Sequence, residues 1–104
     1  MAYDEVLAER VADLCALPVK RMFGGITFLV SGNIACGVIA DDLLVRVPLD
    51  EYDAALREPG ARVFDLTGRV MTGWVVVAGE TLDDDLLADW VGRGVAYAAS
   101  LPPK

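Results

Sequence analysis

Cysteines, carboxylates and arginines are the residues of this chain that could carry chemistry, because the sequence contains no histidine. Without histidine, the commonest general base and the commonest metal ligand are missing, which excludes Ser-His-Asp and Cys-His sites and most zinc sites. Cys15 and Cys36 lack metal-type spacing; Cys36 lies in the apolar run 34–38, which suits a small buried thiol, and Cys15 lies at the edge of the apolar stripe of the first predicted helix. We therefore predict structural roles for both cysteines, and no catalytic residue, metal site or cofactor.

The acidic clusters and the glycines have local structural explanations. The three aspartates at 83–85 stand where a helix is predicted to begin, and carboxylates there favour the positive end of the helix dipole. The aspartates at 41–42 fall in a predicted two-residue turn. Gly24, Gly25 and Gly32 indicate turns rather than a phosphate-binding loop, since no Lys-Ser/Thr pair follows them and no long helix starts there.

The central arginines are the strongest candidates for a binding site. Arg46 interrupts an apolar strand at 43–47, and strand alternation places it on the face of Leu44. At that place it needs a carboxylate partner, a bound anion or solvent. Arg62 and Arg69 could join it on a shared surface, together with only one of Lys20 and Arg21, because these two point to opposite faces of the first strand. An ordinary solvated or ion-paired face and a site for an anion or partner both stay open.

Composition predicts a folded protein that does not bind nucleic acid directly. The chain has 104 residues, of which 55% are hydrophobic, enough to form one core. The formal charge of -7 repels phosphate backbones and anionic lipid. The N-terminus lacks the basic and apolar regions of a signal peptide, and the longest apolar stretch, 74–78, is too short to span a bilayer. We expect a cytoplasmic protein without membrane association.

Hydrophobic periodicity defines the elements that must position these residues. A one-sided helix is predicted over 4–16, with Asp4 as its N-cap and Pro18 beyond its end. Short β-type runs follow, separated at hairpin lengths that favour antiparallel pairing. These runs are 19–23, 26–30, 34–39 and 43–47.

The second half of the chain alternates short helices and strands. A short helix is predicted over 50–57 with Asp50 as its cap, followed by strands at 63–65 and 74–77. A long helix capped by Asp83 then runs to about Ser100. Together these elements predict a single α+β domain over 1–104, with a small, mainly antiparallel sheet of about four to six strands flanked by an N-terminal, a short middle and a long C-terminal helix.

Several short motifs occur in a fixed order along nearly the whole chain. They are Arg21-Met22-Phe23-Gly24-Gly25, Phe28, Gly32-Asn33, Leu44-Val45-Arg46-Val47, Gly73-Trp74 and, opening the last helix, Leu82-Asp83-Asp84-Asp85-Leu86 with Trp90. In this order they resemble the N-terminal domain of the TfoX/Sxy family of competence regulators. Within that resemblance, the motif at 21–25 is a fold signature.

The resemblance implies a regulatory role without catalysis. Full-length members of the family are similar in having a C-terminal helical domain after this one, and they help the cyclic-AMP receptor protein to activate competence promoters. The present chain resembles a stand-alone first domain, so we expect a regulatory protein-interaction domain with a partner in the transcription machinery. The resemblance adds two residues to the candidate contacts for a partner or an anion. The full set is Arg21, Asn33, Arg46, Arg69 and Trp74.

Two further expectations concern binding. The alternative function is a small-molecule or nucleotide-binding module that holds an anion with the central arginines. Exposed strand edges of a small sheet can also pair with another copy of the chain, which predicts a homodimer.

Overall fold

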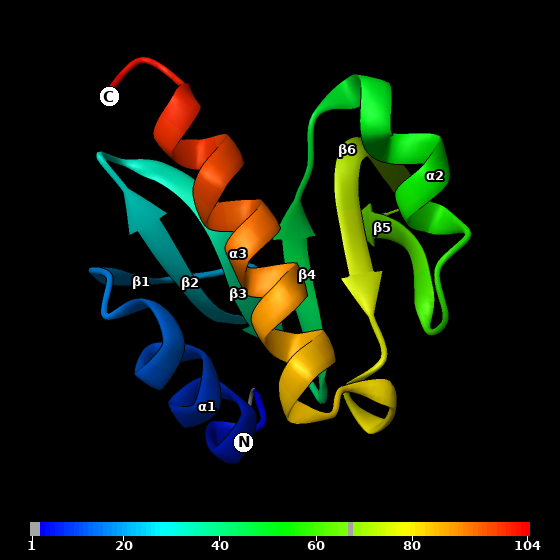
Figure 1. The fold of residues 1–104 in the computed structure, drawn as a ribbon, viewed down its shortest axis with the longest axis horizontal. Helices are drawn as coiled ribbons and strands as arrows, with labels where there is room; N and C mark the ends of the chain where they lie inside the picture. The colour runs from blue at the N-terminus through cyan, green and yellow to red at the C-terminus, as the bar shows by residue number, and fades with distance from the viewer. Residues whose placement is uncertain (1–2, 67) are drawn as a thin grey trace.

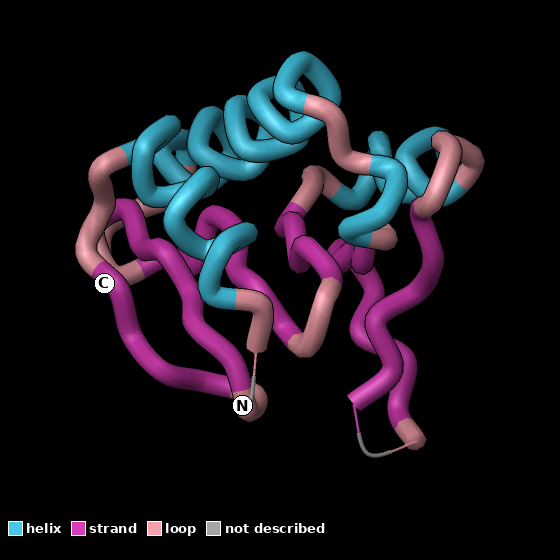
Figure 2. The backbone as a smooth tube through the Cα atoms, turned by 90° about the horizontal axis from the view of Figure 1, so that it is seen from below, coloured by secondary structure: helices cyan, strands magenta, loops and turns pink. Residues whose placement is uncertain are grey.

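A computed structural model describes residues 3–66 and 68–104 as a six-stranded sheet with three α-helices on one face (Figures 1 and 2). The elements are α1 (Glu5–Cys15), β1 (Val19–Met22), β2 (Gly25–Val30), β3 (Asn33–Ile39), β4 (Asp42–Arg46), α2 (Tyr52–Leu56), β5 (Ala61–Leu66), β6 (Arg69–Val77) and α3 (Asp84–Ser100). The strand order is β1-β2-β3-β4-β6-β5, and neighbouring strands pair antiparallel. The predicted α+β fold is confirmed.

Both long helices begin at the predicted capping aspartates. The Asp4 carboxylate accepts hydrogen bonds from the backbone N–H groups of Val6 and Leu7, at 3.0 and 3.1 Å. The Asp83 carboxylate accepts one from Leu86 N–H at 2.7 Å. Each cap satisfies N–H groups that have no partner within the helix. The run at 83–85 is therefore explained by helix initiation.

Two tight hairpin turns join the first three strands. Phe23 and Gly24 connect β1 to β2, and both have positive φ, at 56° and 75°. Ser31 and Gly32 connect β2 to β3 with φ of 50° and 84°. Positive φ at both central residues is typical of the two-residue type I′ turn, whose backbone twist matches the right-handed twist of the flanking strands. The predicted turns at 24–25 and 31–33 are each shifted: Gly25 opens β2 and Asn33 opens β3.

Other predicted boundaries also need correction. The third turn consists of Ala40 and Asp41, while Asp42 opens β4. The middle helix starts with a 3-10 turn (Leu49–Glu51), so Asp50 lies inside that turn and does not cap α2. β5 and β6 are longer than predicted. Next to the turn that joins them, they pair only with each other, as in the pair Asp65–Val70. Polar and exposed residues there break the apolar alternation that marks a strand.

The main core lies between the sheet and the helices. Trp90 of α3 is its largest fully buried side chain. It packs in one cluster with residues from α1, α2 and the sheet, including Val11, Tyr52, Leu43 and Val45. None of the helices within the described ranges is both long and apolar enough to cross a membrane.

A glycine sets how closely α3 approaches the sheet. A Cβ on Gly94 would lie 2.3 Å from the carbonyl oxygen of Ala35 and 3.3 Å from Cγ1 of Val45. Helix α3 can therefore approach β3 and β4 this closely only because residue 94 has no side chain. One turn further along α3, Tyr97 lies over the end of β4. The close approach at Gly94 thus helps to place the Tyr97 ring.

Candidate functional site

A second, smaller apolar cluster lies on the sheet face that carries no helix, and we call it the outer cluster. Figure 2 shows the helices gathered on the other side of the sheet. The outer cluster consists of Phe23, Ile39, Leu44, Phe64, Met71, Trp74 and Val76. Strand alternation accounts for it, since Leu44 points away from the face of Leu43 and Val45. The predicted assignment of Leu44 to the opposite face is confirmed.

Two residues of the motif at 21–25, Phe23 and Gly25, make structural contacts. The Phe23 ring meets Phe64 edge to face at 5.6 Å between centroids and Trp74 at 6.5 Å. The β1–β2 turn therefore packs against β5 and β6, although three strands separate β2 from β5 in the sheet order. Gly25 is needed for pairing, because a Cβ there would lie 2.1 Å from the carbonyl oxygen of Val38.

Arg46 lies at the edge of the outer cluster between two aromatic rings. It pairs with Trp74 across β4 and β6, and its guanidinium carbon lies 5.3 Å from the Trp74 ring centroid. The same carbon lies 5.6 Å from the ring centroid of Tyr97, which comes from α3. All three side chains are half-buried. We call these three residues the arginine clamp.

Within the described residues, Arg46 is half-buried without an ion pair, whereas Arg21, Arg57 and Arg69, which also form none, are exposed. Arg10, Arg62 and Arg93 each form an ion pair with a carboxylate. Within the part of the chain that the structure describes, no carboxylate lies within 4.0 Å of the Arg46 nitrogens, and no acceptor for its N–H groups is present. A cation held by ring faces keeps its in-plane N–H donors available for an anion or a carboxylate.

The other predicted contact residues do not join the clamp. The side chain of Asn33 is buried, and its amide donates to the carbonyl of Pro102 at 2.9 Å, which fixes the C-terminal segment to the β2–β3 turn. Arg21 is exposed on β1, which β2 and β3 separate from β4. Arg69 is exposed at the start of β6, five residues from Trp74, or roughly 17 Å along an extended strand.

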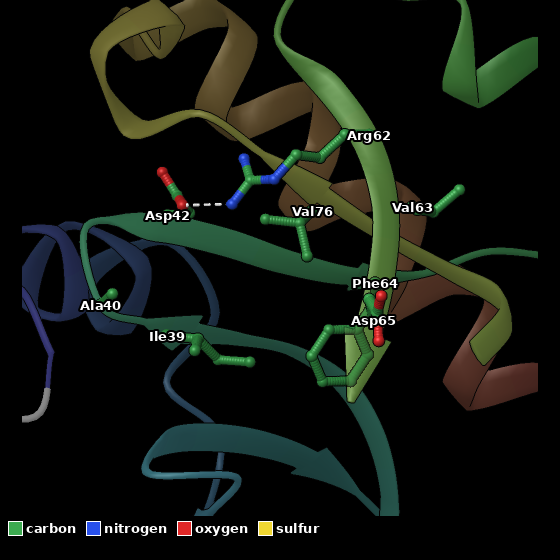
Figure 3. Close-up of a pocket in the computed structure, with 8 residues that line it drawn as sticks. All are labelled: Ile39, Ala40, Asp42, Arg62, Val63, Phe64, Asp65 and Val76. Atoms are coloured by element: carbon green, nitrogen blue, oxygen red, sulfur yellow. Dashed lines mark hydrogen bonds and ion pairs between the residues drawn. The ribbon is translucent and has the colours of Figure 1, made fainter. Parts of the chain in front are cut away.

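A small pocket lies beside the outer cluster, near the start of β4 (Figure 3). It has a volume of about 230 Å³, and Phe64, Val76 and Ile39 form its apolar lining. Two of its three charged side chains are engaged with each other: the Asp42 carboxylate accepts from Arg62 at 2.7 Å and from the backbone N–H of Gly79 at 3.2 Å, while Asp65 is the third charged residue of the lining. Those bonds give Asp42 a structural role in joining β4 to β5.

Sequence reasoning missed two arginine contacts. Tyr97 carried no signal, because its position relative to Arg46 depends on how α3 crosses the sheet. The contacts of Arg93 were also missed. Its guanidinium forms two hydrogen bonds with the Glu58 carboxylate, one of them 2.6 Å long, and an ion pair with Asp89. The guanidinium carbon also lies 4.1 Å from the Trp90 ring centroid. The Glu58 carboxylate raises the pKa of Arg93. The spacing of Asp89 and Arg93, four residues apart on a helix, was the one available signal.

The chain belongs to a family defined by its sequence. Residues 9–98 match the family model described as the TfoX N-terminal domain, so the predicted resemblance is confirmed. No curated protein matches the chain, and no solved structure matches it. Among residues 3–66 and 68–104, no three histidine, cysteine, aspartate or glutamate side chains converge in a way that could hold a metal ion.

Proposed function

We propose that this chain is a non-enzymatic regulatory domain that binds a protein partner through the arginine clamp. The observation that carries the proposal is the Arg46 guanidinium held between the Trp74 and Tyr97 rings without a carboxylate among the described residues. Arginine, tryptophan and tyrosine are the residues enriched at the energetic centres of protein interfaces.

The chemistry of the clamp defines the part of the partner that it would contact. The Arg46 N–H donors, which have no acceptor within the described part of the chain, suit an aspartate or glutamate, and the two ring edges suit an apolar group beside it. Because the whole chain carries a charge of -7, an acidic partner is repelled at long range and attracted at short range by the Arg46 guanidinium. Membership of the TfoX N-terminal domain family supports a cytoplasmic partner in the transcription machinery.

Site-specific photocrosslinking in the host cell tests this proposal. The photoreactive amino acid p-benzoyl-phenylalanine replaces Tyr97, where it keeps an aromatic ring beside Arg46. The matched control places it at Val6 on α1, which is 67% exposed. We expect a discrete adduct from position 97 that is lost when Arg46→Ala is added. Arg46→Lys should also lose the adduct, because the lysine ammonium group cannot form the paired, coplanar hydrogen bonds that a guanidinium forms with a carboxylate.

The identity of the adduct decides between the expected partners. A heteromeric adduct with a transcription protein supports the proposal, and an adduct with a second copy of this chain assigns the clamp to a homodimer. Light scattering of the purified chain then gives the oligomeric state. The proposal fails if position 97 gives no adduct, or if the adducts at 97 survive Arg46→Ala.

Anion binding is the second candidate function, because the same N–H donors of Arg46 could hold a phosphate or carboxylate of a small molecule. A thermal-shift screen against nucleotides and acidic metabolites tests it. We expect any specific stabilisation to vanish in Arg46→Ala and to persist in Arg69→Ala. A shift that is equal in both variants would discard this function.

A further inference from the structure

The outer edge of β1 is the more regular of the two edges of the sheet. β1 is first in the strand order and, among the described residues, pairs with β2 alone. Its four residues pair with β2 without a register shift, whereas β5, at the opposite edge, has a register shift between Val63 and Asp65. Such an irregularity hinders pairing with a further strand. β1 is therefore the edge that can accept one.

The backbone groups of Val19 and Arg21 point toward this edge. The C=O of Pro18 accepts a hydrogen bond from the N–H of Leu29 at 2.9 Å, which makes these two residues a hydrogen-bonded pair of the β1–β2 ladder. Because hydrogen-bonded and non-hydrogen-bonded pairs alternate in antiparallel strands, the N–H and C=O groups of Val19 and Arg21 face away from β2. Both residues are exposed, and no other element in the described part of the chain occupies their backbone groups. A partner strand can bond to them.

A groove of about 240 Å³ separates this edge from α1. Val19 lines it and is directly opposite Phe28, which is buried in the main core, so the groove lies on the face that the helices cover. The apolar floor includes Ile26 and Phe28, and the wall on α1 carries Glu5 and Glu9. Both glutamates are exposed, and neither forms an ion pair within the described ranges. A side chain that a further strand places opposite Val19 enters this groove.

The charges beside the edge select the side chains of the added strand. An apolar floor below two carboxylates suits a lysine or arginine, whose stem covers the floor while its charged end reaches Glu5 and Glu9. On the other face of the sheet, Lys20 favours an acidic residue opposite it and disfavours a basic one. A second copy of β1, in the register that uses the edge groups of Val19 and Arg21, would place Lys20 opposite the same lysine of the other copy. This edge therefore selects a different chain.

We propose that β1 accepts an extended segment of another protein as an additional strand. A lysine or arginine of that segment lies in the groove against Glu5 and Glu9, and an adjacent aspartate or glutamate lies opposite Lys20. The bonds to the main chain of β1 provide affinity, and the two charged side chains provide specificity. This surface goes beyond the arginine clamp, because β2 and β3 separate β1 from β4.

A peptide titration of the full-length chain, labelled with ¹⁵N and followed by NMR, tests the proposal. The probe is the synthetic peptide acetyl-Thr-Val-Glu-Lys-Val-Thr-amide, at about 0.15 M salt so that long-range charge effects are screened. We expect amide hydrogen exchange to slow at Val19 and Arg21 and to stay unchanged at Lys20, whose N–H already faces β2. Two control peptides replace the lysine with glutamate or the glutamate with lysine. Each should bind about threefold more weakly or worse.

Matched variants separate backbone pairing from side-chain effects. Arg21→Pro removes the edge N–H without removing a bond to β2 and should abolish binding, whereas Arg21→Ala keeps the N–H and should bind as the wild type does. Replacing both Glu5 and Glu9 with glutamine should weaken binding about threefold or more. If Arg21→Pro does not fold, the exchange pattern of the wild type still decides.

Three results would overturn the proposal. The first is a peptide that leaves exchange at Val19 and Arg21 unchanged. The second is equal binding of all three peptides, because the charges beside the edge would then select nothing. The third is protection of both amides in the chain without peptide that falls on dilution, because a second copy would then occupy the edge.

Discussion

Arg46 and Trp74 are directly opposite each other on β4 and β6, with the guanidinium carbon 5.3 Å from the indole ring centroid. Backbone pairing of the two strands holds Arg46 and Trp74 in register, and the Tyr97 ring centroid of α3 lies 5.6 Å from the same guanidinium carbon. Among residues 3–66 and 68–104 no carboxylate pairs with this cation, so the two rings position its charge and leave it available. This arrangement supports the proposed role of Arg46 in recognition.

The clamp predicts a moderate contribution of Arg46 to stability. Arg46→Ala removes the contact with both rings, and we expect a loss of about 1 kcal/mol in the free energy of unfolding. Urea denaturation followed by tryptophan fluorescence measures it. Arg69→Ala is the matched control and should change stability by less than about 0.5 kcal/mol, because Arg69 is exposed. Equal losses in the two variants would show that the rings do not stabilise Arg46.

Two glycines of α3 predict opposite effects of the same substitution. Gly94→Ala forces a Cβ to within 2.3 Å of the Ala35 carbonyl oxygen, so α3 must move away from the sheet. We expect a loss of about 2 kcal/mol or more. Gly92 is exposed and has open space, so Gly92→Ala should stabilise the helix by about 0.5 to 1 kcal/mol. Thermal unfolding of both variants checks this, and a neutral Gly94→Ala would contradict the packing described.

The two hairpin turns allow a second matched comparison. Asparagine tolerates positive φ well, so backbone strain should not increase at either turn. Ser31→Asn should therefore be neutral or stabilising by a few tenths of a kcal/mol. Phe23→Asn removes the ring that packs on Phe64 and Trp74, and we expect a loss of about 2 kcal/mol. Denaturant midpoints measure the difference. Similar values for both variants would mean that Phe23 serves the turn alone.

Net charge predicts the outcome of a DNA-binding assay. With a formal charge of -7, the chain should give no sequence-specific complex in a mobility-shift experiment, even at low salt. Arg46→Ala should not change that result. A specific complex that weakens in Arg46→Ala would instead reassign the clamp to phosphate recognition.

Some boundaries could not be read from the sequence, for identifiable reasons. The long β5–β6 hairpin was predicted as two short strands because its exposed ends lack apolar alternation. Phe23 was assigned to a strand because aromatic residues favour strands, yet Gly24 and the tertiary packing of its ring hold it in a turn at φ of 56°. In both cases the missing information was the position of another strand.

The sequence by itself determined the α+β class, the helix caps at Asp4 and Asp83, the face on which Arg46 lies and the family. These features depend on residues close together in the chain, where periodicity and capping act. Only the tertiary structure decided that Tyr97 meets Arg46 and that Glu58 meets Arg93. Those contacts depend on the angle and depth at which helices cross the sheet, which are set by the packing of many side chains at once and by the space that Gly94 leaves.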